Sequence, residues 1–365
     1  MPSAKRDQTS SVMQEGRWLR LFLGLFVAAL LVCGCIVYYL DPFFHYHGPR
    51  AGFVYELNNQ RSQNDGITRH FSYEALITGT SMSENFRTSS FARLFSLEAV
   101  KLPYPGARYK EINDNLKKAL RTGNVKVVVR PLDDSYLLVH KDAQREDLGE
   151  YPVWLTNNNP FDDVKYLLNL DVLGGYCVPM CLKKAAGEAG SVTSFDEYGV
   201  DWPDDPAERN ALGGLTFSGK AIPQEALTDA EAAMVLENIR QNVTDVIAEY
   251  PDTEFYYFFP PYSIVHYGEL YENGELEKIL AAEELVAEEM CGYENLHLFS
   301  FSHNAGVITS LDNYKDSGHY SPEICDWMLE EMRADRGRLT PDTLHAYFDD
   351  LRAKLLSYDY QNLRQ

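Results

Sequence analysis

The sequence predicts an α/β protein, with a parallel sheet flanked by helices, attached to a single N-terminal transmembrane helix. Residues 21–40 form an uncharged, largely apolar run, which at about 1.5 Å per residue matches a bilayer core of roughly 30 Å. From Tyr73 onward, short apolar runs that end near Gly or Pro alternate with segments of helical spacing. This alternation is typical of a parallel sheet with helices on its faces.

The residues that flank the apolar run predict its orientation. Arg17 and Arg20 precede the run and Asp41 follows it. By the positive-inside rule we expect residues 1–20 in the cytoplasm, a single pass through the cell membrane, and an extracytoplasmic main domain. Aromatic residues at both ends suit the two headgroup interfaces; they are Trp18, and at the far end Tyr38, Tyr39, Phe43, Phe44 and Tyr46. A cleaved signal peptide is the alternative, but its apolar segment would cover only about 7–15 residues.

The composition supports a globular ectodomain and excludes some partners. Hydrophobic residues make up 45% of the chain and aromatic residues 13%, and the formal net charge is −21. We expect no nucleic acid partner, because the sequence offers no basic stripe for phosphates. Four cysteines follow the apolar run: Cys177, Cys181, Cys291 and Cys325. Outside the cytoplasm Cys177 and Cys181 could pair, or all four could remain buried thiols. Their spacing does not suit zinc, and we expect neither a metal nor a cofactor.

The soluble chain begins with a predicted connector, residues 41–70, because Pro and Gly interrupt any apolar periodicity there. The α/β domain is predicted over residues 71–338. Its first strand is the apolar run that ends at Gly79, and the valine-rich run before Pro131 is the clearest buried strand. The predicted strands are 75–78, 97–102, 125–129, 254–259 and 296–301.

Helices are predicted between these strands from apolar spacing and from start signals. Thr228 and Glu231 form a capping box that opens a long helix. Ser321 before Pro322, and Thr340 before Pro341, mark two further starts. The second of these opens the C-terminal helical segment, residues 339–365. The helix that begins at Thr228 is predicted to reach residue 250, and the other predicted helices cover residues 82–95, 109–121 and 275–290.

The alternation lapses over residues 139–226, which are rich in Gly, Pro, Asn and Asp. We interpret this stretch as an insertion within one domain. Insertions beside an α/β site often control access to it, and a solvated excursion is the alternative.

Ser81 is the candidate nucleophile. It follows the first strand, and ligands of parallel sheets collect beyond the carboxyl ends of the strands. A serine there can equally cap a helix, and Ser83 is a neighbouring competitor. Two Asp-x-x-His pairs are candidates for the base and its orienting acid. Asp342 and His345 fall at the start of the last predicted helix, where the acid suits the helix dipole. Asp316 and His319 lie in a loop after the last strand, which makes them the better pair.

The order of these segments resembles the SGNH/GDSL hydrolase family. The first block of that family is similar to Gly79-Thr80-Ser81, its second-block glycine is similar to Gly106, and its last block is similar to Asp316–His319. The resemblance covers residues 73–135 and 252–335. It implies a three-layer, flavodoxin-like domain with Ser81, His319 and Asp316 as catalytic residues. The backbone N–H groups of Ser81 and Gly106 would then form the oxyanion hole.

Two positions depart from the family pattern. Thr80 replaces the Asp that precedes the nucleophile, where the residue mainly supports the turn. The third-block Asn, an oxyanion donor, has no match in Arg130-Pro-Leu-Asp-Asp134. Removing one such donor typically costs about 10²–10³ in rate.

Two functional hypotheses follow. The first is a serine esterase or acyltransferase that acts on an acylated surface polymer or carrier, as expected from the similarity to membrane-anchored members in teichoic acid D-alanylation and exopolysaccharide O-acetylation. Its partners would be a cell-surface glycan, a teichoic acid or an acyl carrier, with the bilayer around residues 21–40. The second is a non-catalytic accessory protein that binds a partner such as a membrane O-acyltransferase. A nucleotide-binding protein is disfavoured, because Gly79-Thr-Ser lacks the further glycines and lysine of a phosphate loop.

Overall fold

The computed structural model describes residues 4–147 and 152–363. The chain divides into two compact units. Unit 1 comprises Met1–Glu56, Asp65–His70 and Pro152–Val192, and unit 2 comprises Leu57–Asn64, Phe71–Tyr151 and Thr193–Gln365. The predicted insertion, residues 139–226, is divided between them, because its central part belongs to unit 1 and its flanks to unit 2.

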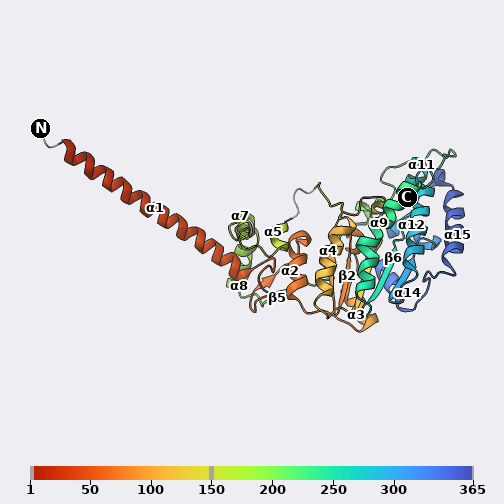
Figure 1. Cartoon of the computed structure of the whole chain (residues 1–365), viewed down its shortest axis with the longest axis horizontal. Helices are drawn as coiled ribbons and strands as arrows, with labels where there is room; N and C mark the ends of the chain where they lie inside the picture. The colour runs from red at the N-terminus through yellow and green to blue at the C-terminus, as the bar shows by residue number, and fades with distance from the viewer. Residues whose placement is uncertain (1–3, 148–151, 364–365) are drawn as a thin grey trace. The chain divides into compact units, whose positions relative to one another are not determined.

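Unit 2 contains a parallel sheet of five strands in the order β3-β2-β4-β6-β7. Figure 1 labels β2 and β6 of this sheet. The strands are β2 (Ala75–Gly79), β3 (Ala99–Pro103), β4 (Val127–Pro131), β6 (Glu254–Phe259) and β7 (Leu296–Ser300). Every residue of β2 and β4 is buried. The predicted α/β class with a parallel sheet flanked by helices is confirmed.

Helices cover both faces of the sheet. The chain runs outward from β2 to β3 and then back to β4, so right-handed crossovers place α3 and α4 on opposite faces. The α-helices of unit 2 are α3 (Thr88–Phe95), α4 (Tyr109–Leu120), α9 (Asp229–Ile239), α10 (Asp245–Glu249), α11 (Ile264–Asn273), α12 (Leu276–Met290), α13 (Ala305–Ile308), α14 (Pro322–Arg333) and α15 (Leu344–Leu356). α3 packs against α14, whereas α12 packs against α9 and α15. The short 3₁₀-helical turns are η1 (Ser81–Ser83), η2 (Asp134–Tyr136), η4 (Pro206–Glu208), η6 (Leu311–Asn313) and η7 (Tyr360–Asn362), and η5 (Arg240–Thr244) is a π-helical segment.

Three predicted helices need correction. Residues 82–95 form η1 and then α3, because the extended backbone of Arg87 separates them. The long helix after Thr228 is interrupted by the π-helical segment η5. The last helix begins at Leu344 instead of at Pro341, because Leu339 N–H donates to the carbonyl of Leu298 and keeps the preceding segment beside β7. α11 was not predicted.

Unit 1 contains the N-terminal helix α1 (Ala4–Leu40). Its segment Gly16–Leu40 is long and apolar enough to span a membrane or to act as a signal anchor. The other elements are a two-stranded parallel sheet of β1 (Val54–Tyr55) and β5 (Ser191–Val192), and the helices α5 (Val153–Thr156), α6 (Val164–Leu167), α7 (Leu170–Val172), η3 (Leu173–Cys177) and α8 (Val178–Ala185). α2 (Gln60–His70) contributes residues to both units. Residues 41–70, predicted as a connector, therefore contain regular structure.

The cysteines are all free thiols in the described chain. Cys177 and Cys325 are buried, but Cys181 is exposed and Cys291 is half-buried. The structure therefore shows neither a Cys177–Cys181 disulfide nor four buried thiols.

Candidate active site

Ser81 lies where β2 ends, as the first residue of the short helix η1. Gly79 makes this placement possible. A Cβ atom on Gly79 would lie 2.6 Å from Cγ of Pro131, the last residue of β4. Glycine therefore lets the ends of β2 and β4 approach closely, which fixes the start of the turn that carries Ser81.

Neighbouring hydroxyls take the structural roles in this turn. Thr80 is the N-cap of η1, and its Oγ1 accepts a hydrogen bond from Met82 N–H at 3.2 Å. Ser83 is fully buried and donates to the carbonyl of Thr80 at 2.8 Å. The Ser81 side chain makes neither of these hydrogen bonds. Thr80, and not Ser81, is therefore the cap of the helix.

Asp316 and His319 reach Ser81 from the loop before α14. Asp316 Oδ1 accepts hydrogen bonds from the backbone N–H groups of Gly318 at 2.9 Å and His319 at 2.8 Å, which folds the loop around the carboxylate. His319 Nδ1 lies 2.8 Å from Asp316 Oδ2, and its Nε2 lies 2.8 Å from Ser81 Oγ. The structure thus brings together all three residues of the predicted Ser-His-Asp set, although 238 positions separate Ser81 from His319.

Asp316 and His319 each stabilise the charged form of the other. Burial raises the pKa of Asp316, but its hydrogen bond with His319 and the charge of that ring outweigh burial and lower the pKa to about 2. Burial lowers the pKa of His319, but the hydrogen bond and charge of Asp316 outweigh it, and the pKa is raised above its ordinary value. Asp316 therefore stays ionised at neutral pH and stabilises a protonated His319.

Further hydrogen bonds hold the serine turn and the histidine loop together. Tyr320 OH donates to the carbonyl of Met82 at 2.7 Å, and Asn85 Nδ2 donates to the carbonyl of Tyr320 at 2.8 Å. Ser263 Oγ also donates to the carbonyl of Ser317, two residues before His319, at 2.6 Å. Hydrogen bonds from neighbouring segments therefore position both Ser81 and His319.

Gly106 lies beyond the end of β3, which pairs with β2 in parallel so that Pro103 faces Gly79. Its φ of +68° is in the left-handed region, which favours glycine. A Cβ atom there would also lie 2.5 Å from Nη1 of Arg145. Within residues 4–147 and 152–363, the backbone N–H groups of Ser81 and Gly106 donate to no protein acceptor, so both remain available to a ligand at this edge of the sheet.

The buried carboxylate of Asp133 was not predicted from the sequence. It lies after β4 and accepts hydrogen bonds from the hydroxyls of Thr80 and Tyr262, the latter at 2.5 Å. Burial raises the pKa of Asp133 to about 6, although both hydroxyl donors act in the opposite direction. Its position in the sequence could have indicated this site, because Thr80, Asp133 and Tyr262 follow the carboxyl ends of β2, β4 and β6.

A second buried acid follows Ser81 by three residues. Glu84 Oε1 accepts a hydrogen bond from Gln60 Nε2 at 2.8 Å. Burial raises the pKa of Glu84 to about 7, against the effect of that hydrogen bond. Its negative charge acts on His319 and further raises the pKa of that ring.

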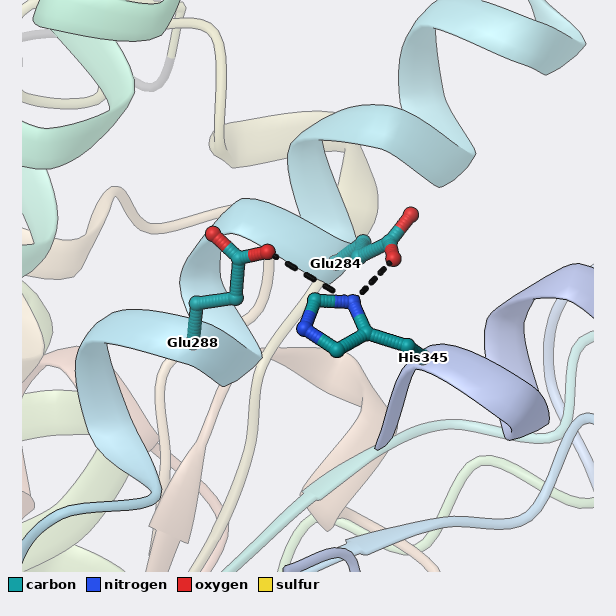
Figure 2. A group of neighbouring side chains, drawn as sticks. All are labelled: Glu284, Glu288 and His345. Carbon is teal, nitrogen blue, oxygen red and sulfur yellow. Dashed lines mark hydrogen bonds and ion pairs between the residues drawn. The ribbon is translucent and has the colours of Figure 1, made fainter. Parts of the chain in front are cut away.

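The competing histidine, His345, lies in a different setting on α15 (Figure 2). Its Nδ1 lies 2.9 Å from Glu284 Oε1 and 3.7 Å from Glu288 Oε1, both on α12. These are the one group of three ligand-type side chains close enough to hold a metal ion among the described residues. Arg352 Nη2 pairs with Glu284 Oε2 at 2.8 Å, so the carboxylate already has cationic partners. The arrangement is a surface ion-pair network.

Comparison of the sequence with protein-family models and with curated proteins gives no match.

Proposed function

We propose that this protein is a membrane-anchored, extracytoplasmic serine esterase or acyltransferase of the SGNH/GDSL type. One observation carries the proposal: a continuous hydrogen-bonded series from Ser81 Oγ through the His319 ring to the Asp316 carboxylate. A serine hydroxyl is a weak nucleophile, and a histidine base oriented by a carboxylate is the arrangement that activates it.

The proposed reaction begins with attack by Ser81 Oγ on the carbonyl carbon of an ester. His319 Nε2 takes the hydroxyl proton, and the imidazolium is stabilised by Asp316. The carbonyl oxygen becomes an oxyanion that accepts hydrogen bonds from the N–H groups of Ser81 and Gly106. Collapse breaks the ester bond, and the alcohol leaves with the proton from His319. The acyl-enzyme is then resolved by water in an esterase, or by a sugar or polyol hydroxyl in a transferase.

The place of the reaction follows from the N-terminal helix. We propose that residues 21–40 of α1 cross the cell membrane, with residues 1–20 in the cytoplasm and the α/β domain outside. An extracytoplasmic serine hydrolase on such an anchor meets acylated envelope material. The proposed substrates are a cell-surface glycan, a teichoic acid or an acyl carrier.

Labelling of the full-length protein in lipid nanodiscs with a fluorophosphonate probe tests this function, because the probe reacts with activated serines. We expect labelling of the wild type and none of Ser81→Ala or His319→Ala. His345→Ala is the matched control, a histidine that also pairs with a carboxylate but lies on the surface, and it should label like the wild type. A folded wild type that fails to label would overturn the hydrolase proposal.

Asp133 favours a second candidate function. The end of β4 presents a buried carboxylate where the resembled family has an amide donor, and above its pKa of about 6 a carboxylate offers no hydrogen to an oxyanion. A non-catalytic accessory protein that binds a membrane O-acyltransferase would tolerate this. Purification of the intact protein from its own membranes separates the two: a stable complex that survives in Ser81→Ala, together with absent probe labelling, would support the accessory role.

A further inference from the structure

Unit 1 exposes a concentration of apolar side chains over residues 153–182. Outside α1, the described residues expose nine large apolar side chains, and six of them fall in this stretch: Val153, Phe161, Val164, Leu170, Val178 and Leu182. Phe161 is 89% exposed and Leu170 78% exposed. Single exposed apolar residues are ordinary on protein surfaces, whereas a local concentration marks an interaction surface.

This stretch packs against the C-terminal part of α1, within the same unit. α6 and η3 both contact α1. At Gly34 an added Cβ would lie 3.8 Å from Cβ of Leu167 and 3.8 Å from Cδ2 of Leu168. Val37 and Leu40 are buried on this face of α1, while Ile36 and Tyr39 remain exposed. The side of the helix with Gly34, Val37 and Leu40 therefore packs inside unit 1, whereas Ile36 and Tyr39 lie on sides that remain exposed.

The position of Gly34 along α1 indicates how deep in the bilayer its contacts with Leu167 and Leu168 lie. Arg20 is the last charged residue before the apolar run, and a hydrocarbon core of about 30 Å measured from there reaches Leu40. Gly34 precedes Leu40 by six residues, which is about 9 Å along the helix. The side chains that pack on Gly34 therefore lie at the depth of the acyl chains when α1 spans the bilayer.

The buried acid that follows α1 has all its hydrogen-bond donors inside the protein. Asp41 is completely buried at the end of α1. Its Oδ1 accepts hydrogen bonds from His45 N–H and Tyr166 OH, both at 2.9 Å. Its Oδ2 accepts from the N–H groups of Tyr46 at 2.7 Å and His47 at 2.9 Å. A carboxylate with four internal donors suits a site from which water is excluded, and the Tyr166 bond ties α6 to α1 there.

We propose that residues 153–182 form a membrane-seated platform whose exposed apolar side chains lie in the leaflet that holds the C-terminal end of α1. The occupant of this surface is the lipid bilayer, because α6 and η3 of the stretch pack on α1 and the leucines at Gly34 lie at the depth of the acyl chains. The inference rests on the membrane anchoring in the proposed function, but it is independent of the Ser81 chemistry. It assigns the central part of the insertion to lipid contact.

The test uses the full-length protein in nanodiscs that contain phosphatidylcholine with a diazirine on one acyl chain. After irradiation, lipid adducts are mapped by mass spectrometry of peptides. We expect adducts on residues 21–40 and on residues 153–182. Met234, an exposed apolar residue of unit 2, serves as the comparison and should carry few. Adducts on residues 21–40 with none on residues 153–182 would overturn the proposed lipid contact. The exposed side chains of residues 153–182 would then face solvent or another protein. Their absence from both segments would overturn the anchoring as well.

A variant pair sharpens the result. Leu170→Asp with Leu182→Asp places charges on the exposed face without altering the packing on Gly34, and we expect adducts on residues 153–182 to fall at least fivefold while those on 21–40 persist. Val200→Asp with Met234→Asp adds equal charge to exposed apolar positions of unit 2 and should change neither. Unchanged adducts on 153–182 in the first variant would count against the platform. If that variant does not fold, the wild-type map still decides.

Discussion

The two Asp-x-x-His segments of this chain have the same spacing and opposite surroundings. His319 is held between Asp316 and Ser81 by short hydrogen bonds in a loop beyond the sheet. His345 stands on the surface of α15, and its partners are glutamates of α12 (Figure 2). The Asp-x-x-His spacing alone is therefore not sufficient to form a catalytic pair. What distinguishes the first pair is a loop that follows a β-strand and faces a serine at the end of another strand.

The largest expected effect comes from removing the charge of Asp316. Asp316→Asn keeps the size of the side chain but no longer stabilises the protonated His319 or fixes its tautomer. We expect the rate of fluorophosphonate labelling to fall by about 10⁴, the cost of this change in a Ser-His-Asp triad. Asp342→Asn, the same change in the other pair, is the matched control and should leave the rate unaltered. A wild-type rate in Asp316→Asn would show that this carboxylate does not support the base.

The pH dependence of labelling tests the protonation of His319 beside Asp316. His319 acts as a base only when neutral, so the rate should rise tenfold per pH unit and level off above its pKa. Because Asp316 outweighs burial, the midpoint should lie above 6.5. The other groups that act on the ring are Glu84, which raises its pKa, and Lys315, which lowers it. In Asp316→Asn, burial still lowers the pKa of His319, but the charge of Asp316 no longer raises it. The midpoint of the pH profile should therefore shift to lower pH. A midpoint that stays in place would contradict this assignment.

The close approach at Gly79 gives the next effect. Gly79→Ala places a methyl group against the rigid ring of Pro131, and we expect the end of β2 and Ser81 to shift. Labelling should slow by at least about tenfold, since small displacements of catalytic groups are costly. Unfolding free energy should drop by about 1–3 kcal/mol, as for other overpacked sites. Gly292→Ala, where an added Cβ meets nothing within 4 Å, is the control for both measurements.

The fold was predictable to the extent that local sequence determines it. All five strands of the main sheet were found, because each is a short apolar run beside other signals such as Gly79 or Pro131. The helix predicted over 82–95 was wrong in its first half. Apolar spacing cannot distinguish a short turn from a helix, and the side chain of Asn85 is instead committed to the carbonyl of Tyr320. That bond joins residues 235 positions apart.

The candidate site and unit 1 show the same limit. Ser81, Asp316 and His319 were selected because each follows a predicted strand. The contacts of Asp133 with Thr80 and Tyr262 could not be predicted, because they join the ends of three strands. No local pattern indicated that Leu167 packs on Gly34. The Gly, Pro and Asn content of residues 139–226 suggested an insertion within one domain, although part of it belongs to the unit that holds α1.

Thr80→Val tests whether the Asp133 carboxylate depends on its hydroxyl donors, Thr80 and Tyr262. The change leaves Asp133 with one donor fewer, so we expect the free energy of unfolding to fall by about 1–3 kcal/mol at pH 8. The hydroxyl favours the charged form of Asp133, and its removal should raise a pKa that is already about 6. The loss of stability should therefore shrink as the pH falls below 6 and Asp133 becomes protonated.

Urea denaturation at pH 8 and pH 5 measures both quantities for Thr80→Val. Thr309→Val, which removes an exposed hydroxyl bonded only to the carbonyl of Ala305, controls for the loss of a hydroxyl and should change stability little at either pH. Equal losses in Thr80→Val at pH 8 and pH 5 would mean that the hydroxyl acts through its cap on Met82 N–H instead of through the charge of Asp133. A pH-dependent loss with unchanged probe labelling would place this carboxylate in the support of the turn, and His319 would remain the one base that Ser81 requires.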